Sequence, residues 1–204
     1  MPLSQTERHS YHHGDLRAAI LRRAAEIIEA SGIEALSLRG IARDLGVSHG
    51  APNRHFRSKQ ELLSALAAEA WNSACGATLA AAESEDGGDP HRVLNAMGRG
   101  FLRWALANRP LLVAILHPDV SRASDPSLDA AFADYQATIR KAVEATQADG
   151  RHPEVDPAIL NLYTNSVPFG IAALLLHRNS WGELMERDPE TVITELIELV
   201  VPTR

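Results

Sequence analysis

The sequence predicts an all-α protein, with a short helix-turn-helix near the N-terminus and a larger set of helices behind it. Apolar residues recur every three or four positions along most of the 204 residues, and no stretch shows the sustained alternation that is typical of strands. Four Asp-Pro pairs resemble helix starts, and Gly32 and Gly46 separate short helical segments in the N-terminal part.

The first predicted helix begins at Asp15, whose carboxylate suits the cap position. Its apolar positions fall on one face because they follow helical spacing, and they are Leu16, Ile20, Ala24, Ile27 and Ile28. Gly32 is expected to end this helix, since glycine takes the left-handed conformation at low cost.

Two short helices with a tight turn between them come next. Ser37 caps the first, which is predicted to span Ser37–Leu45, and Ser48 caps the second, which is predicted to span Ser48–Phe56. Gly46 supplies the turn between them. Such a pair is too small to bury its own apolar faces, so we expect the first helix and a following long helix to support it.

The long helix is predicted from a capping box, with Ser58 at the cap and Glu61 at the third helical position, and it is expected to reach Glu83. Further helix starts are marked by Asp-Pro, where the aspartate accepts first-turn N–H groups and the proline loses nothing by lacking one. The helices predicted in this way lie near 90–108, 110–116, 126–147, 157–177 and 189–201.

The second short helix of a helix-turn-helix enters the DNA major groove, with its N-terminal residues at base edges. Its expected exposed residues are His49, Gly50, Ala51, Asn53 and Arg54. Arg39 is placed to reach a base or a phosphate, and we expect Ser37, His55 and Lys59 to contact phosphates. The spacing fits a structural corner as well, so geometry alone leaves both interpretations open.

The charge of the chain is uneven although its net value is −6. Residues 1–72 hold nine Arg/Lys and eight Asp/Glu, whereas residues 73–204 hold eleven and eighteen. Five of the nine histidines also lie in the first part, namely His9, His12, His13, His49 and His55. This asymmetry favours a DNA-facing part and an acidic part with another task.

Composition also limits the location and the chemistry. No window of about 18 uninterrupted apolar residues is present, and the polar stretch from Met1 to Asp15 lacks the apolar run of a secretory signal. The single cysteine, Cys75, has no partner for a disulfide or a paired-cysteine metal site. We therefore expect a cytoplasmic protein with no membrane segment, no metal and no cofactor. A flexible arm near DNA explains the N-terminal histidines better than a metal site does.

The segment from Tyr11 to Trp71 resembles the DNA-binding domain of TetR/AcrR-type transcriptional regulators. The matching runs are YHHGDLR at 11–17, GIEALSLR at 32–39, IA at 41–42, LGVS at 45–48, HF at 55–56 and KQELL at 59–63. The resemblance implies an all-α homodimer with a DNA-binding domain over residues 11–72 and an effector-binding and dimerisation domain over residues 73–204. The nine residues singled out above inherit the DNA-contacting roles by position. Asn53 stands where the family usually has tyrosine, and we hypothesise that Asn53 reads an adenine edge or contacts a phosphate.

The resemblance further implies a double-stranded operator with inverted repeats and an unknown, mostly apolar small-molecule effector. The last two predicted helices are amphipathic, and periodicity fits either core helices or half of an intermolecular four-helix bundle. The resemblance favours the bundle and hence a homodimer. Ordinary core positions are the more common role for such residues, and the candidate effector contacts are Phe101, Trp104, His117, Phe132, Tyr135, Tyr163, Phe169 and His177.

Two other classes of protein compete with a ligand-released repressor. A helical enzyme is one, although the sequence has no Gly-rich phosphate loop, paired-cysteine motif or nucleophile elbow. An interaction module with a degenerate helix-turn-helix is the other. A transcriptional activator is a further alternative, because the same DNA-binding unit serves both directions of control.

Overall fold

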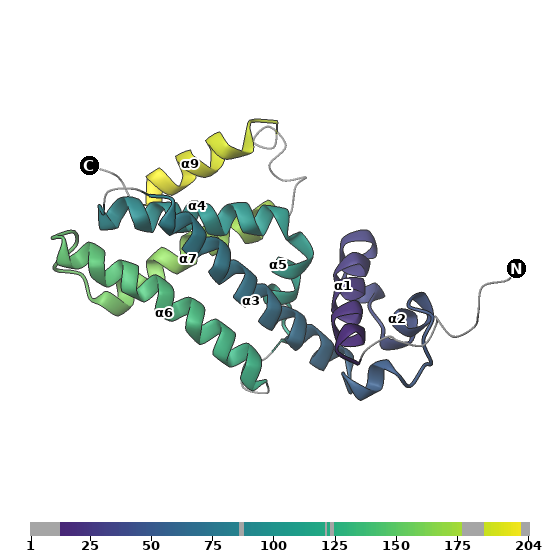
Figure 1. Ribbon diagram of the computed structural model, residues 1–204. Coiled ribbons are helices and arrows are strands. Elements are labelled where there is room, and N and C mark those ends of the chain that lie inside the picture. The colour runs from purple at the N-terminus through teal and green to yellow at the C-terminus, as the bar shows by residue number, and fades with distance from the viewer. Residues whose placement is uncertain (1–12, 86–87, 121, 123–124, 177–185, 201–204) are drawn as a thin grey trace, which may run out of the picture.

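The computed structural model describes residues 13–85, 88–120, 122, 125–176 and 186–200, and every regular element in these ranges is a helix (Figure 1). The elements are α1 (His13–Ser31), the 3₁₀ turn η2 (Ile33–Ala35), α2 (Leu38–Asp44), the 3₁₀ turn η3 (Pro52–Arg54), α3 (Lys59–Glu83), α4 (Pro90–Ala107), α5 (Arg109–Leu116), α6 (Pro126–Ala148), α7 (Pro157–Leu175) and α9 (Pro189–Val200). The predicted all-α fold class is confirmed.

The predicted Asp-Pro helix starts are confirmed by their hydrogen bonds. The Asp125 carboxylate accepts from the backbone N–H groups of Ser127 and Leu128 at 2.9 and 3.1 Å. The Asp156 carboxylate accepts from Ala158 N–H at 2.7 Å. Asp89 and Asp188 cap α4 and α9 in the same way. Each proline then occupies a first-turn position where no backbone donor is needed.

The predicted ends of the first helix and of the long helix are confirmed in part. The Ser58 hydroxyl accepts from Glu61 N–H at 3.1 Å and caps α3, which reaches Glu83 as predicted. The Glu61 carboxylate, however, accepts from Arg57 N–H at 2.6 Å, one residue before the expected partner. The expectation that Asp15 begins α1 is wrong, because the helix already starts at His13.

The buried apolar side chains form two clusters that meet within α3. The first cluster includes Ile20 of α1, Ile41 of α2 and Leu66 of α3. The second begins at Ala67 and continues through α4, α6, α7 and α9. Figure 1 shows α3 running from the end that holds α1 and α2 into the bundle of the other helices. The expected domain boundary at residue 72 therefore falls inside one unbroken helix.

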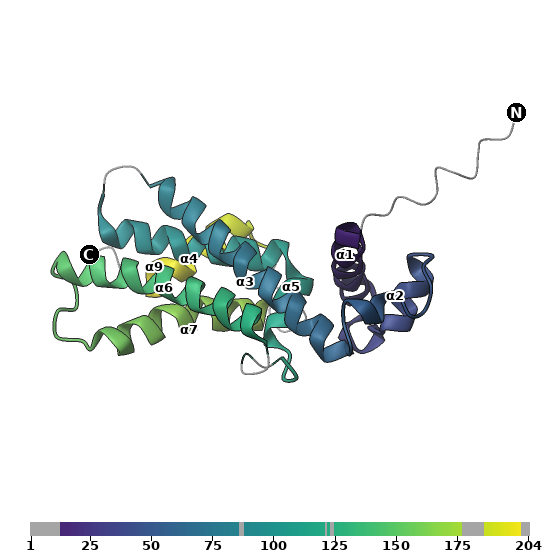
Figure 2. The same ribbon diagram turned by 60° about the horizontal axis from the view of Figure 1, so that its bottom comes forward.

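Helix α5 is the second link between the two clusters. Leu112 packs into the second cluster, whereas Ala114 packs into the first. The helix contacts both α1 and α3, and Figure 2 shows it between α1 and the bundle. One short helix therefore touches the α1–α2 unit and the larger core at the same time.

Helix α7 carries an apolar face that the other described residues leave uncovered. Among the described residues, α7 is the one helix whose length and composition would allow it to cross a membrane, yet only 17% of its apolar window is buried. Its exposed apolar residues include Ile159, Leu162 and Leu174. Pro168 lies inside the helix and faces the core. A helix so apolar and so exposed needs a covering partner in water.

Candidate nucleic-acid interface

Two left-handed glycines position the short elements of the helix-turn-helix. Gly32 has φ of 80° and ends α1, and Gly46 has φ of 66° and turns the chain after α2. The turn is closed by a 3.0 Å hydrogen bond from Val47 N–H to the Ala42 carbonyl. Side chains with a Cβ rarely adopt these angles, so both predicted glycine roles are confirmed.

The segment predicted as a helix from Ser48 to Phe56 is not one continuous helix, and that prediction is wrong. Residues 49–51 form a turn, and only Pro52–Arg54 are helical, as the 3₁₀ turn η3. The Ser48 carbonyl accepts from Ala51 N–H at 2.9 Å, a bond three residues along. Pro52 explains the difference, because it lacks the N–H that would close a first α-helical turn onto Ser48.

The same segment is anchored from below by two buried side chains. Pro52 and Phe56 are both buried, and Phe56 N–H donates to the Pro52 carbonyl at 2.9 Å. The guanidinium of Arg17 on α1 lies over the Phe56 ring, with Cζ 5.4 Å from the ring centroid. This anchoring leaves Asn53 and Arg54 on the solvent side of η3.

A groove of about 580 Å³ collects most of the predicted DNA-contacting residues. It lies between the start of α2, the turn before η3 and the start of α3. Its lining residues are Leu36, Ser37, Leu38, Arg39, His49, Gly50, Asn53 and Lys59. Three predicted residues lie outside this lining. Arg54 is exposed beside Asn53, whereas Ala51 and His55 are half-buried.

Ser37 has a structural task as well as its predicted one. Its hydroxyl oxygen accepts from Gly40 N–H at 3.1 Å and caps α2, as predicted from the sequence. A Cβ at position 40 would stand 2.9 Å from that oxygen, so glycine at this position gives the cap its room. The hydroxyl proton of Ser37 is not used by this bond, so it can be donated to an acceptor such as a phosphate oxygen.

An acidic residue at the rim of the groove was not anticipated. Glu34 in η2 brings its Oε2 to 3.8 Å from the Lys59 Nζ, and the Glu34 side chain is 90% exposed. Sequence alone gives no signal for this pair, because 25 positions separate the two residues. The carboxylate competes with a phosphate for the Lys59 ammonium group.

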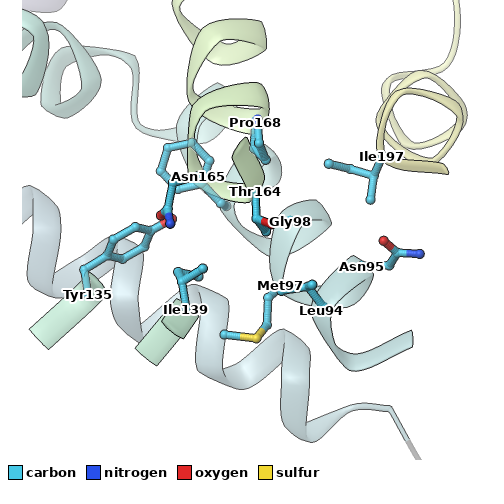
Figure 3. A pocket seen from close by; sticks show the side chains of 11 residues that line it. Leu94, Asn95, Met97, Gly98, Tyr135, Ile139, Thr164, Asn165, Pro168 and Ile197 are labelled. Carbon is cyan, nitrogen blue, oxygen red and sulfur yellow. The ribbon is translucent and has the colours of Figure 1, made fainter. Parts of the chain in front are cut away.

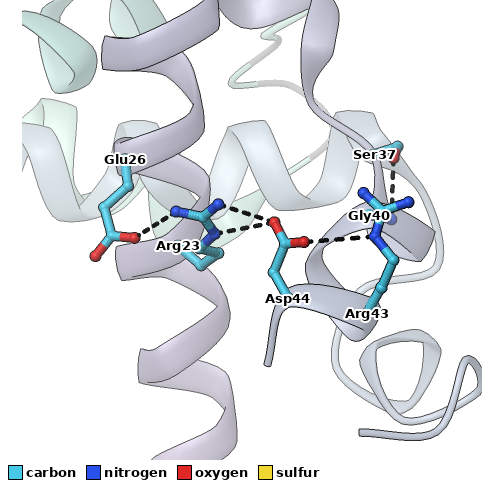
Figure 4. A network of polar contacts seen from close by, with 6 residues as sticks. All are labelled: Arg23, Glu26, Ser37, Gly40, Arg43 and Asp44. Atoms are coloured by element: carbon cyan, nitrogen blue, oxygen red, sulfur yellow. Dashed lines mark hydrogen bonds and ion pairs between the residues drawn. The ribbon is translucent and has the colours of Figure 1, made fainter. Parts of the chain in front are cut away.

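A polar network fixes the position of α2 against α1 (Figure 4). Arg23 of α1 donates from Nε and Nη2 to the Asp44 carboxylate at 3.1 and 2.9 Å, and from Nη1 to Glu26 at 2.8 Å. The hydrogen bonds with Glu26 and Asp44 raise the pKa of Arg23. This two-pronged contact holds the helix-turn-helix at a defined angle to its supporting helix.

The predicted effector contacts separate into two groups in the C-terminal part. Phe101 and Tyr135 line a small cavity of about 20 Å³ between α4, α6, α7 and α9 (Figure 3). Phe132, Tyr135 and Phe169 line a second cavity of about 190 Å³ between α3, α6 and α7. Tyr135 stands between the two, and its burial, together with the nearby Cys75 thiol, raises the pKa of its hydroxyl well above the usual value.

Of the other four candidates, the three that lie in the described residues do not line either cavity. Trp104 is buried and donates from its indole nitrogen to the Ser73 hydroxyl at 3.0 Å. His117 follows α5 and accepts from Asp119 N–H, and Tyr163 is exposed on α7. His177 and the N-terminal histidine arm, residues 1–12, lie outside the described residues.

Sequence reasoning missed Trp71 and Asn165, which do line the larger cavity. Asn165 carried a readable signal, since Asn161 and Asn165 stand four apart in an otherwise apolar helix. Polar residues spaced in this way share one helix face, and a buried polar face points to a site.

Comparison with known proteins agrees with this geometry. Residues 20–66 match the family model of bacterial regulatory proteins of the tetR family. No curated protein matches the sequence. A protein of unknown function from Rhodococcus sp. RHA1 is 29% identical, with a TM-score of 0.78 and coverage of 95% of this chain and 97% of that chain.

Two functionally described structures share the fold. The TetR family transcriptional regulator PfmR from Thermus thermophilus is 24% identical, with a TM-score of 0.65 over 89% of this chain and 96% of that chain. AibR, solved with isovaleryl coenzyme A and operator DNA, is 18% identical, with a TM-score of 0.68 over 91% of this chain and 98% of that chain. Residues 20–66 of the chain thus match the tetR family model, and the described residues have the fold of proteins of that family.

Proposed function

We propose that this protein is a homodimeric transcriptional repressor that binds a palindromic operator and leaves it when a small molecule occupies the C-terminal region. The observation that carries the proposal is the groove at the helix-turn-helix. Arg39, His49, Asn53 and Lys59 meet there around the bare backbone of Gly50. These side chains supply donors for base edges and phosphates, and Gly50 allows close approach to the groove floor. A protein with this task acts in the cytoplasm.

The exposed apolar face of α7 supports a homodimer through α7 and α9. Leu162 of α7 is 64% exposed and Leu199 of α9 is 78% exposed. Pairing these two helices with their copies buries both residues in a four-helix interface. Two recognition segments must then lie about 34–36 Å apart to meet successive major-groove faces, which requires an operator of two inverted half-sites.

Contacts of α5 support control by a ligand at a distance from the DNA. Arg109 at the start of α5 donates to the Leu176 carbonyl at the end of α7 at 2.9 Å. Past its other end, the Asp119 carbonyl accepts from the Gln60 side chain of α3 at 2.9 Å. Through these two contacts, a ligand that shifts α7 would also shift α5 and the start of α3 beside the helix-turn-helix. AibR, which was solved with both an acyl-coenzyme A and operator DNA, is a protein of the same fold.

The deciding experiment measures binding of the full chain to labelled intergenic DNA from upstream of its own gene by fluorescence anisotropy, at several salt concentrations. We expect specific binding that weakens steeply with salt, since each neutralised phosphate releases counterions. Equal, weak binding to upstream and unrelated DNA would contradict the proposal and favour an interaction module or an enzyme. In vitro transcription from the bound promoter then separates repression from activation.

Asn53 offers a sharper test of the interface. In the variant Asn53→Ala we expect weaker operator binding and a relaxed preference at one base pair, because the amide no longer reaches an adenine edge or a phosphate. The control is Arg43→Ala, an exposed cation on α2 that does not line the groove. Unchanged affinity and preference in Asn53→Ala would reject the assigned role of Asn53.

A further inference from the structure

The cavity between α3, α6 and α7 has a composition that selects a narrow class of ligand. Its walls are aromatic, with Trp71 lying 5.0 Å from Phe132 and 4.9 Å from Tyr135 between ring centroids. The Trp71 and Phe169 rings are stacked, with an interplanar angle of 8°. Leu162 completes the apolar lining. Flat apolar walls of this kind favour an aromatic ring over a flexible chain.

The volume limits the ligand to one ring. The cavity holds about 190 Å³. An apolar cavity of about 150 Å³ accepts benzene, whereas sites for drug-sized ligands begin near about 300 Å³. A benzene ring with one or two small substituents fills this space, whereas a bicyclic or acylated molecule would have to extend through the mouth of the cavity.

The charge of the lining argues against an ionised ligand. All eight lining residues are uncharged, and their polar members are Tyr135, Gln136, Asn165 and Ser166. A buried carboxylate would find no cation among the lining residues, and the nearby Arg122 is already paired with Asp129 at 3.8 Å. The guanidinium of Arg122 lies over the Phe132 ring, with Cζ 3.9 Å from the centroid. Its positive charge also disfavours a cationic ligand.

Asn165 lines both this cavity and the smaller one, and one of its polar atoms has no partner among the described residues. The Asn165 Oδ1 is buried and has no hydrogen bond. Its orientation is fixed, because the Asn165 Nδ2 donates to the Asn161 carbonyl at 2.7 Å, and a flipped amide would place two oxygens together. Burying an acceptor in this state is costly, so the site favours a ligand that donates a hydrogen bond.

The other polar groups of the lining are already engaged. The Ser166 hydroxyl donates to the Leu162 carbonyl at 2.7 Å. The Gln136 Oε1 accepts from the Asn161 amide at 3.4 Å. Among the polar atoms of the lining, the Asn165 Oδ1 is therefore the buried acceptor that lacks a hydrogen-bond donor.

From these observations we infer that the cavity binds an uncharged, single-ring aromatic molecule with an O–H or N–H group that donates to the Asn165 Oδ1. The inference rests on the proposed ligand-responsive regulator and names its ligand class. Leu162 and Ser166 stand at the mouth of the cavity and also on the exposed face of α7. The ligand thus touches the helix that we assign to the dimer contact, which places the effector directly against the surface that sets the spacing of the two DNA-binding units.

The test compares three probes of similar shape by isothermal titration calorimetry on the full chain. These are p-cresol, p-xylene, which replaces the hydroxyl by a methyl group, and 4-methylbenzoate, which carries a charge. We expect p-cresol to bind about ten-fold or more tightly than p-xylene, because only p-cresol satisfies Asn165. 4-Methylbenzoate should bind at least as weakly as p-xylene. Equal affinities for p-cresol and p-xylene, or no binding of p-cresol, would overturn the inference.

Two variants tie the result to this cavity. Asn165→Leu keeps the shape of the side chain and should abolish the preference for p-cresol over p-xylene. Ser166→Trp fills the mouth and should lose binding of both probes, and sedimentation equilibrium on the same sample shows whether the variant keeps its assembly state. A preference that survives Asn165→Leu, or probe binding that survives Ser166→Trp, would contradict the assignment.

Operator binding by the ligand-free protein is measured in parallel by anisotropy. Intact operator binding without a response to p-cresol overturns only the ligand class. Failure of operator binding in the ligand-free protein overturns the proposed regulator itself, whatever the calorimetry gives. The two failures are therefore distinguishable.

Discussion

The carboxylate of Glu34 and the ammonium group of Lys59 lie 3.8 Å apart at the rim of the groove, which places a negative charge beside a predicted phosphate contact. Glu34 is in η2 and Lys59 begins α3, so the pair joins the turn before α2 to the helix that follows η3. When DNA approaches, the Lys59 ammonium must exchange this carboxylate for a phosphate. The carboxylate itself remains close to the polyanion and repels it.

We therefore predict that Glu34→Gln strengthens operator binding by about two- to five-fold, the effect of one surface charge interaction. The slope of log affinity against log salt should become steeper, since Lys59 is then free to displace a counterion. Fluorescence anisotropy at several salt concentrations measures both quantities. Glu29→Gln on the far part of α1 is the control, and equal effects in the two variants would mean that only net charge matters.

Gly50 gives a steric test of how closely the protein approaches DNA. A Cβ added at this position meets nothing within 4 Å, and the residue has no positive φ, so Gly50→Ala should leave stability unchanged. In the complex the added methyl group points into the groove that DNA must enter, and we expect a loss of operator affinity of about ten-fold. Thermal unfolding and anisotropy on the same sample check the two halves of the prediction. Full affinity in Gly50→Ala would show that DNA does not enter this groove.

Phe56 should control the stability of the helix-turn-helix. Its side chain is 2% exposed and packs in the first cluster with Ile20 and Ile41. Phe56→Ala removes this packing and should lower the free energy of unfolding by about 3–5 kcal/mol. Urea denaturation followed by circular dichroism measures the change. Arg54→Ala, an exposed neighbour, should change it by less than about 0.5 kcal/mol.

The exposed face of α7 makes a prediction about assembly. Leu162→Asp places a charge on this face and should convert the dimer to a monomer, since an unpaired carboxylate in the interface is costly to bury. Sedimentation equilibrium measures the result. The matched control is Leu79→Asp, which changes an exposed leucine of α3. A dimer that persists in Leu162→Asp would place the interface elsewhere.

We expect the start of α9 to lose stability at low pH, when the capping residue Asp188 becomes protonated. Hydrogen bonds from the backbone N–H and the hydroxyl of Thr191 lower the pKa of Asp188 below its usual value of 3.8. A group with a lowered folded-state pKa stabilises the protein above the unfolded-state pKa and loses this effect as the pH falls through the folded-state value. We expect Asp188→Ala to lower Tm at pH 7, with a smaller difference from the wild type near pH 3. A constant difference across this range would rule out the ionised cap.

The sequence predicts local features of this protein well because their causes are local. Asp125 followed by Pro126 predicts both a helix cap and the first helical turn, and Gly46 predicts a turn. Neither prediction depends on the rest of the chain. Pro52 shows the limit of this reasoning. Its missing N–H is also a local feature. The helical periodicity of the segment was nevertheless given more weight, so a helix was predicted where the chain forms a turn and η3.

The candidate sites depend on contacts between residues that are far apart in the sequence. The groove residues were predicted from a known arrangement of helices, but the pairing of Glu34 with Lys59 arises from the packing of η2 beside α3. Tyr163 and Asn165 lie two positions apart on α7 and therefore on nearly opposite sides of the helix. The side on which each one falls is set by how α7 rests on α6, so the exposed Tyr163 was predicted and the buried Asn165 oxygen was not.

The unbroken course of α3 through both cores has a mechanical consequence. At 25 residues the helix is about 37 Å long, so a tilt of about 10° around one end would displace the other by about 6 Å. Trp71, which lines the cavity between α3, α6 and α7, lies on this helix, and Lys59 is its first residue. Under the proposed function, a small shift of Trp71 on ligand binding would become a larger displacement of Lys59 along this helix, and the two DNA-binding units would no longer match the pitch of the double helix.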